Sequence, residues 1–109
     1  MADWFARRGY RILARNWMAR GGELDLVVAR GDVVAFVEVR SVSRRWLASP
    51  TVTVTPRKQA RVAAAADQYL RANGLDPARI RFDVAGVVQD RGDWLLELVE
   101  NAFVPAWSF

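Results

Sequence analysis

The chain has 109 residues, 52% of them hydrophobic, which is enough for one compact domain spanning residues 1–109. Cysteine and histidine are absent, which excludes disulfides, thiolate metal sites and catalysis by a Ser-His or Cys-His pair. A metal site would have to use oxygen ligands, which favours a hard cation such as Mg²⁺ or Mn²⁺. The net charge of +4 and the pI of about 10.6 favour an anionic partner, nucleic acid first and an anionic membrane surface second.

Nothing in the sequence indicates a membrane span or a secretory signal. No uninterrupted apolar run reaches about 18 residues, the length that a transmembrane helix needs. The first eight residues lack the charged-then-apolar order of a signal peptide. We therefore expect a cytoplasmic protein that does not enter the membrane.

The N-terminal third predicts a short helix followed by three strands. Residues 3–9 form the helix, residues 10–17 the first strand, and a Gly-Gly pair then breaks the chain. Strands at residues 23–29 and 33–40 follow. The last of these is apolar on both faces over most of its length, so we predict a sheet with helices on both sides.

Gly31 and Asp32 lie at the centre of this apolar hairpin, as is common for a two-residue loop. Such a loop pairs Arg30 with Val33 and sets the register outward along both strands. The hairpin therefore has a predicted partner for every residue of its two strands.

This register brings two acids together. Asp25 falls opposite Glu38, and Glu23 falls opposite Arg40. Because side chains alternate along a strand, all four project from one face, while Leu24 points to the other. Opposed Cβ atoms lie about 5 Å apart, where like charges repel. A divalent metal ion, a shared proton or a guanidinium could each compensate.

Two interpretations of these acids stay open. In the first, Asp25 and Glu38 each give an oxygen to a metal, the backbone carbonyl of Val39 gives a third, and Glu23 is an outer ligand. In the second, they are exposed strand acids that arginines such as Arg40 neutralise, with Glu23 paired to Arg40.

Residues 41–54 are rich in Ser, Thr, Arg and Val and are predicted to form a long loop. Arg44, Arg45 and Trp46 make a basic and aromatic cluster there. Such a cluster can contact phosphates through arginine and a base through tryptophan. A solvated loop with one tucked tryptophan explains the same residues equally well.

A helix over residues 56–72 has clear ends. Thr55 is placed as its N-cap and Pro56 as its first residue, and Asn73-Gly74 is a stop signal.

Its first turns are basic. Lys58 is the sole lysine of the chain, and it either stays solvated or donates its ammonium to the acids. Gln59 is a second candidate contact for phosphate or water. The predicted nucleic-acid-binding residues are Arg44, Arg45, Arg57, Lys58 and Arg61.

Strands at residues 80–88 and 94–99 complete the chain, with a turn at 91–93 and an aromatic tail at 101–109 that packs back on the body. The order predicts an α/β fold, a mixed sheet of about five strands flanked by helices. The five tryptophans fit core positions or the surface of a homodimer better than nucleotide platforms.

Five short motifs resemble the YraN-type family, a group of uncharacterised small bacterial proteins, and the resemblance covers residues 9–103. They are Gly22–Leu26, Phe36–Arg40, Val54–Gln59, Arg81–Val84 and Asn101–Phe103.

This family is similar to the restriction-endonuclease-like fold and, within it, to Holliday junction resolvases. Their pattern is an Asp, a hairpin and then Glu-x-Lys, so the resemblance implies that Asp25 and Glu38 are metal-binding acids. Arg40 stands where the lysine is expected, and it keeps the charge but not the compact ammonium. Relatives also have a longer first helix, with a Gly-Glu near its start.

The implied function is a metal-dependent endonuclease that uses Mg²⁺ or Mn²⁺ on branched or structured DNA, with Asp25, Glu38 and Arg40 as catalytic residues. The alternative is a nucleic-acid-binding or partner-binding domain that keeps the fold without the chemistry.

Overall fold

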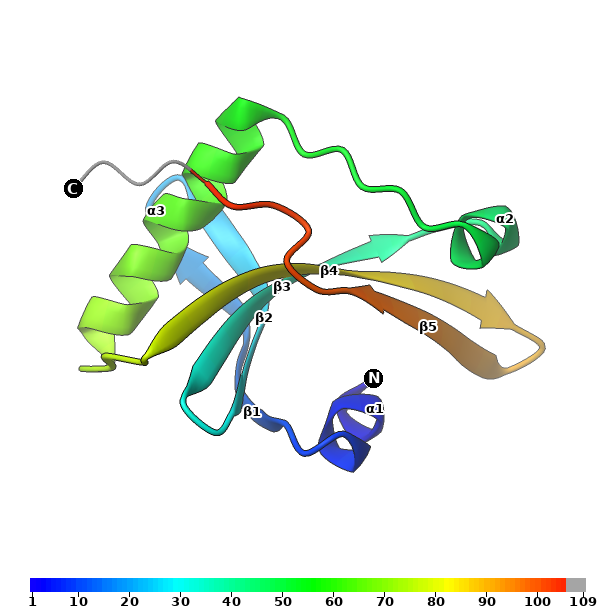
Figure 1. Cartoon of the computed structure of the whole chain (residues 1–109), viewed down its shortest axis with the longest axis horizontal. Coiled ribbons are helices and arrows are strands. Elements are labelled where there is room, and N and C mark those ends of the chain that lie inside the picture. Colours follow the sequence, from blue (N-terminus) through cyan, green and yellow to red (C-terminus); the bar gives the residue numbers. More distant parts are fainter. Residues whose placement is uncertain (106–109) are drawn as a thin grey trace.

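The computed structural model describes residues 1–105, and its five strands form one sheet in the order β1-β2-β3-β4-β5 (Figure 1). All neighbouring strands are antiparallel except β3 and β4, which are parallel. This confirms the predicted mixed sheet flanked by helices. In chain order the elements are α1 (Ala2–Arg7), β1 (Arg11–Ala19), β2 (Gly22–Arg30), β3 (Val33–Ser41), α2 (Arg44–Ala48), α3 (Pro56–Ala72), β4 (Arg79–Asp90) and β5 (Asp93–Val99).

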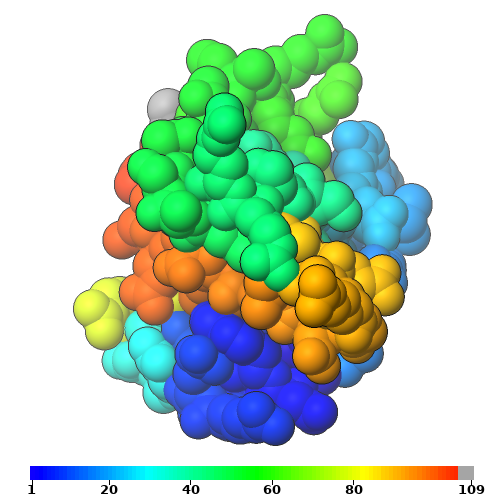
Figure 2. Space-filling model, turned by 90° about the vertical axis from the view of Figure 1, so that its right-hand side faces the viewer, coloured from blue at the N-terminus to red at the C-terminus, as the bar shows by residue number. Residues whose placement is uncertain are grey.

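Helices cover both faces of the sheet. The long helix α3 lies across one face, and α1 lies on the other (Figure 1). Figure 2 shows α1 and α2 on opposite sides of the β4–β5 hairpin. The core is accordingly split in two: Phe36 and Tyr69 belong to the cluster under α3, and Phe5 and Val37 belong to the cluster under α1.

Helix α3 begins and ends where its capping residues predict. The Thr55 side chain accepts a hydrogen bond from the Lys58 amide at 3.2 Å, and Pro56 is the first helical residue. Asn73 is the C-cap, and Gly74 has a φ of +62°. These ends fix which residues of the first turn face the sheet.

The predicted hairpin register is confirmed from Arg30↔Val33 to Leu26↔Val37. The prediction for Leu24 is wrong, because Leu24 packs in the cluster under α3 while Leu26 packs under α1. Two residues an even number apart cannot face opposite sides of a regular strand, so the alternation of β2 is interrupted at Asp25.

The segment predicted as a loop contains the five-residue helix α2. Ser43 is its N-cap, and its hydroxyl accepts from the Trp46 amide at 3.2 Å. The Trp46 ring lies against Gly86 of β4, where any Cβ would overlap it. Its indole N–H donates to the Thr51 carbonyl at 2.8 Å. The interpretation of a tucked tryptophan is therefore confirmed.

Past β5 the chain returns to the core: Phe103 is buried under α3, and the Ala102 amide donates to the Phe82 carbonyl at 2.8 Å. Packing of the tail is thus confirmed up to residue 105, and the predicted packing of 106–109 lies outside the described residues. Among the helices described here, none combines the length and the apolar character that a membrane crossing requires.

Candidate functional site

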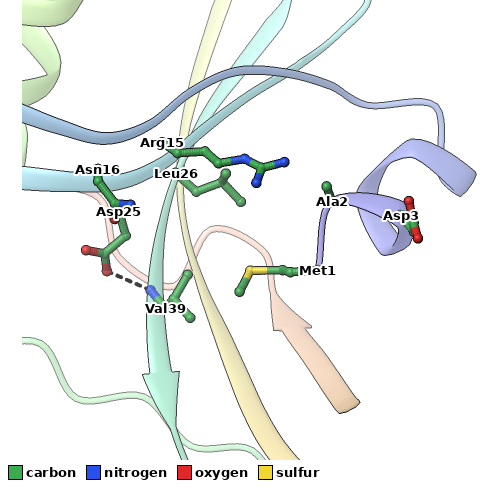
Figure 3. A pocket seen from close by; sticks show the side chains of 8 residues that line it. All are labelled: Met1, Ala2, Asp3, Arg15, Asn16, Asp25, Leu26 and Val39. Atoms are coloured by element: carbon green, nitrogen blue, oxygen red, sulfur yellow. Dashed lines mark hydrogen bonds between the residues drawn. The ribbon is translucent and has the colours of Figure 1, made fainter. Parts of the chain in front are cut away.

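Asp25 lies where β2 and β3 separate. Its Oδ2 accepts a hydrogen bond from the Val39 backbone N–H at 2.9 Å, so the carboxylate continues the ladder that ends at Leu26↔Val37 (Figure 3). Its Oδ1 accepts no hydrogen bond from any residue that the structure describes. One oxygen therefore fixes the side chain, and the other remains available to a ligand.

Glu38 is held by two cations. Its Oε2 pairs with the Arg40 guanidinium at 3.0 Å, and its Oε1 pairs with the Lys58 ammonium at 3.2 Å. The exposed fraction is 16% for Glu38, 34% for Arg40 and 47% for Lys58, so water and ions reach the group from the side of the cations. Lys58 thus reaches one of the two acids, Glu38, while about half of its side chain stays exposed to solvent.

Both acids line a small cavity of about 20 Å³ at the foot of α3, together with Glu23, Lys58 and the buried Asp83. That volume is enough for one water molecule or one small ion. Within residues 1–105 no three Asp or Glu side chains are placed to share a metal. A divalent ion here would take one or two carboxylates and complete its shell with waters or phosphate oxygens, as Mg²⁺ commonly does.

Arg40 pairs with Glu38 two residues away, rather than with Glu23 across the hairpin, so the predicted Glu23–Arg40 pair is wrong. The exposed Glu23 side chain has no partner among the residues described. Gln59 donates to the Val54 carbonyl at 2.8 Å, which uses its amide to hold the segment before α3 rather than to face the acids.

The predicted nucleic-acid-binding residues fall into two groups. Arg57 and Arg61 are exposed on the first turns of α3 and make no ion pair with any described residue. Arg45 on α2 is likewise exposed and unpaired within the described chain. Arg44 pairs with Asp90 at the end of β4, which neutralises it in part. Among the predicted binding residues, Arg57 and Arg61 thus add unpaired positive charge to the helix that carries Lys58.

Sequence reasoning missed the environment of Asp83, which is 1% exposed in β4. Arg81 donates to both of its oxygens at 2.9–3.1 Å, and the Asn101 amide donates at 3.0 Å. The Tyr10 hydroxyl accepts from Arg81 at 2.6 Å. An aspartate two residues after an arginine in an apolar strand is the signal that could have revealed this pair.

Burial dominates the titration of Asp83: it raises the pKa of this carboxyl, and the hydrogen bonds from Arg81 and Asn101 only partly oppose that effect. Burial also lowers the pKa of Arg81, but its hydrogen bonds to Asp83 and Tyr10 outweigh that effect and raise it overall. Arg81 thus stays charged, and the pair links β4 to Tyr10, which precedes β1, and to Asn101, which follows β5.

Comparison with known proteins agrees with the motifs. The model of the uncharacterised protein family UPF0102 matches residues 1–87. A UPF0102 protein of Pelotomaculum thermopropionicum is 43% identical over 104 residues, which cover 94% of this chain and 87% of the relative. A UPF0102 protein of Anaeromyxobacter dehalogenans is 44% identical over 102 residues, which cover 94% of this chain and 76% of the relative. The YraN-type resemblance is confirmed, and the chain belongs to the uncharacterised protein family UPF0102.

Proposed function

We propose that this protein binds nucleic acid and carries a metal-dependent phosphodiesterase site that acts on branched or structured DNA. The observation that carries the proposal is the placement of Asp25 and Glu38. Asp25 is locked by the amide that follows Glu38 in the chain, and both acids line one cavity of the size of an ion. The resemblance to junction resolvases, which rests on the same two acids, adds to it.

Asp25 and Glu38 would hold Mg²⁺ or Mn²⁺, with the Val39 carbonyl as a third ligand. The free Oδ1 of Asp25 is a fixed carboxylate oxygen, which is a suitable donor for a hard cation. When bound, such an ion neutralises phosphate charge and makes a coordinated water more acidic. Glu38 has to exchange a cationic side chain for the ion, and Lys58 is the more exposed of its two partners.

Lys58 and Arg40 would contact the phosphate. The lysine of the Glu-x-Lys pattern is absent here, but the Lys58 ammonium approaches the same glutamate from α3. A compact ammonium can contact a water and a phosphate oxygen together, whereas the planar guanidinium of Arg40 suits two oxygens. Lys58 and Arg40 together would thus make the water and phosphate contacts that one lysine makes in the Glu-x-Lys pattern.

Binding would be electrostatic and largely independent of sequence. The exposed Arg57 and Arg61 continue the positive charge from Lys58 along α3. When these cations neutralise DNA phosphates, the counterions condensed on the DNA are released, so the affinity for DNA should fall steeply as the salt concentration rises.

The test is a manganese titration of the protein in which cleavage of a DNA four-way junction is followed in parallel. We expect slow cleavage by the unmodified chain, faster cleavage by Arg40→Lys and none by Asp25→Asn. The asparagine oxygen can still accept from the Val39 amide, so Asp25→Asn is a blank that retains the local structure. If Arg40→Lys cuts no faster than this blank, the nuclease proposal is wrong.

The second candidate is a nucleic-acid-binding or partner-binding domain without chemistry. One observation favours it: both oxygens of Glu38 already have cationic partners, so the acids are compensated by side chains alone. Salt-dependent DNA binding without manganese-dependent cleavage would support this candidate. Absence of DNA binding even at low salt would leave only the partner-binding form.

A further inference from the structure

Asp25 also lines a larger cavity, between the sheet and the N-terminal segment (Figure 3). Its volume is about 480 Å³, within the ~300–1,000 Å³ typical of small-ligand sites. The residues that line it are Met1, Ala2, Asp3, Arg15, Asn16, Asp25, Leu26 and Val39. None of the functions assigned above to Asp25, Glu38 or the basic residues of α3 uses this cavity.

The lining combines an apolar wall with two cationic groups, the Arg15 guanidinium and the N-terminal ammonium of Met1. Leu26 and Val39 form the wall on the sheet. Arg15 extends past Leu26 toward the N-terminal segment, and its guanidinium makes no hydrogen bond or ion pair with any described residue (Figure 3). A guanidinium without a carboxylate partner is a ready donor to a phosphate.

Charge argues against a small free anion as the ligand. Asp3 and Asp25 balance Arg15 and the N-terminal ammonium of Met1 in the lining, so inorganic phosphate gains little net attraction by entering. A nucleotide within a DNA strand differs, because it adds an apolar base face that can pack on Leu26 and Val39. The DNA strand that carries this nucleotide is also held by the cations of α3.

We infer that this cavity receives one unpaired nucleotide of the DNA strand that lies at the Asp25–Glu38 site, with Arg15 on its phosphate. The inference rests on the proposed function and deepens it. Asp25 lies where β2 and β3 separate and lines both cavities, one on the α3 side of the sheet and one on the α1 side. A DNA strand that crosses this gap at the acids would bring its next nucleotide to the larger cavity.

The consequence is a substrate preference. A base inside a duplex has to unstack and unpair before it can enter a side pocket, whereas a base at a bulge, flap or junction is already free. The cavity would therefore favour DNA with an unpaired nucleotide over continuous duplex, without reading its sequence.

The test compares two duplexes of equal length in EDTA, one fully paired and one with a single 2-aminopurine bulge. We expect the unmodified chain to bind the bulged duplex about tenfold more tightly, the effect of one charge-assisted hydrogen bond. The emission of 2-aminopurine should change on binding, since the base leaves the stack for the cavity.

Two variants probe the cavity, and one is a matched control. Arg15→Gln removes the phosphate donor, and Ala2→Leu fills the cavity from the wall opposite the sheet; each should remove the preference and keep duplex binding. Arg11→Gln removes the same charge from the same strand, outside the cavity, and should keep the preference. Equal urea midpoints for the two arginine variants would show that folding is unaffected.

The outcomes separate the two proposals. Equal affinity for both duplexes, or a loss in Arg11→Gln as large as in Arg15→Gln, overturns the cavity inference. Manganese-dependent cleavage of the paired duplex in that case leaves the proposed function standing. Failure to bind either duplex at low salt overturns both.

Discussion

Two neighbouring strands each carry an acid and an arginine two residues apart, Glu38 and Arg40 on β3 and Arg81 and Asp83 on β4, and the surroundings of the two pairs differ. On β4, Arg81 and Asp83 are 13% and 0% exposed, and their further partners are Tyr10, Glu100 and the Asn101 amide. On β3, Glu38 and Arg40 are 16% and 34% exposed, and the only further partner among described side chains is Lys58. The β4 pair is closed by the protein, and the β3 pair is open to water.

The difference shows how burial decides what an ion pair can do. A buried pair exposes little of itself to a ligand, and its partners keep it in place because an unpaired buried charge is costly. An open pair contributes little to stability, but it can exchange a side-chain cation for an ion or a phosphate. Similar sequences on adjacent strands thus serve structure in one place and provide a candidate site in the other.

The largest expected effect is on stability. Asp83→Ala leaves Arg81 buried without its carboxylate and should lower the free energy of unfolding by about 3–5 kcal/mol. Glu38→Ala, the matched change in the open pair, should cost no more than about 1 kcal/mol. Urea unfolding of both variants measures the contrast, and similar losses would contradict it.

Next in size is the effect of free and paired arginines on DNA binding. Arg57→Gln removes an arginine that has no partner within the described chain and should reduce the slope of log affinity against log salt by about 0.9. Arg44→Gln should reduce the slope by less, because Asp90 already neutralises Arg44 in part. Fluorescence anisotropy over a salt series gives both slopes, and a larger change for Arg44→Gln would reverse the interpretation.

A smaller effect should appear in metal affinity. Lys58→Met frees Oε1 of Glu38 from its ammonium, so Mn²⁺ should bind about two- to fivefold more tightly, the equivalent of an exposed ion pair. Electron paramagnetic resonance of free Mn²⁺ measures this. Arg57→Gln, one residue away, controls for the general loss of positive charge; an equal gain there would show that Lys58 does not compete at Glu38.

The smallest effect is the pH dependence of the closed pair. Burial raises the pKa of Asp83 above its ordinary value of 3.8, so the folded state binds its proton more tightly than the unfolded state. The contribution of Asp83 to stability is therefore largest below that ordinary value and falls as the pH rises through the raised pKa.

Urea unfolding from about pH 3 to pH 6 tests this sign, with Asp83→Asn as the reference that cannot titrate. The free energy of unfolding of the unmodified chain, relative to Asp83→Asn, should decline with rising pH. An increase would mean that the Arg81 hydrogen bonds outweigh burial.

Sequence reasoning predicted what local interactions determine. Gly31-Asp32 set the hairpin register, and Thr55-Pro56 with Asn73 set the ends of α3, because turns and caps depend on a few adjacent residues. The predicted pairs Asp25–Glu38 and Glu23–Arg40 lie beyond the observed ladder, which ends at Leu26↔Val37, and Asp25 instead accepts from the Val39 amide.

Tertiary packing determined the rest. The interruption at Asp25 lies where the β2–β3 ladder ends, and strict alternation along one strand could not show it. Lys58 meets Glu38 only because α3 crosses the sheet at one angle, and Asp83 is buried by segments far from it in sequence. Helix α2 is too short for periodicity to reveal, and Trp46 holds it against Gly86.

The parallel pairing of β3 and β4 has a consequence for the order of folding. Strands β1, β2 and β3 are joined by short turns and can pair early, so Asp25 and the Glu38–Arg40 pair can form from local contacts alone. A parallel partner needs a long crossover, and here that crossover consists of α2, the segment after it and α3. Lys58 therefore reaches Glu38 only when α3 has packed on the β1–β3 hairpins, a step that the local turns do not supply. The lysine–glutamate contact thus joins the crossover to the strand that begins it.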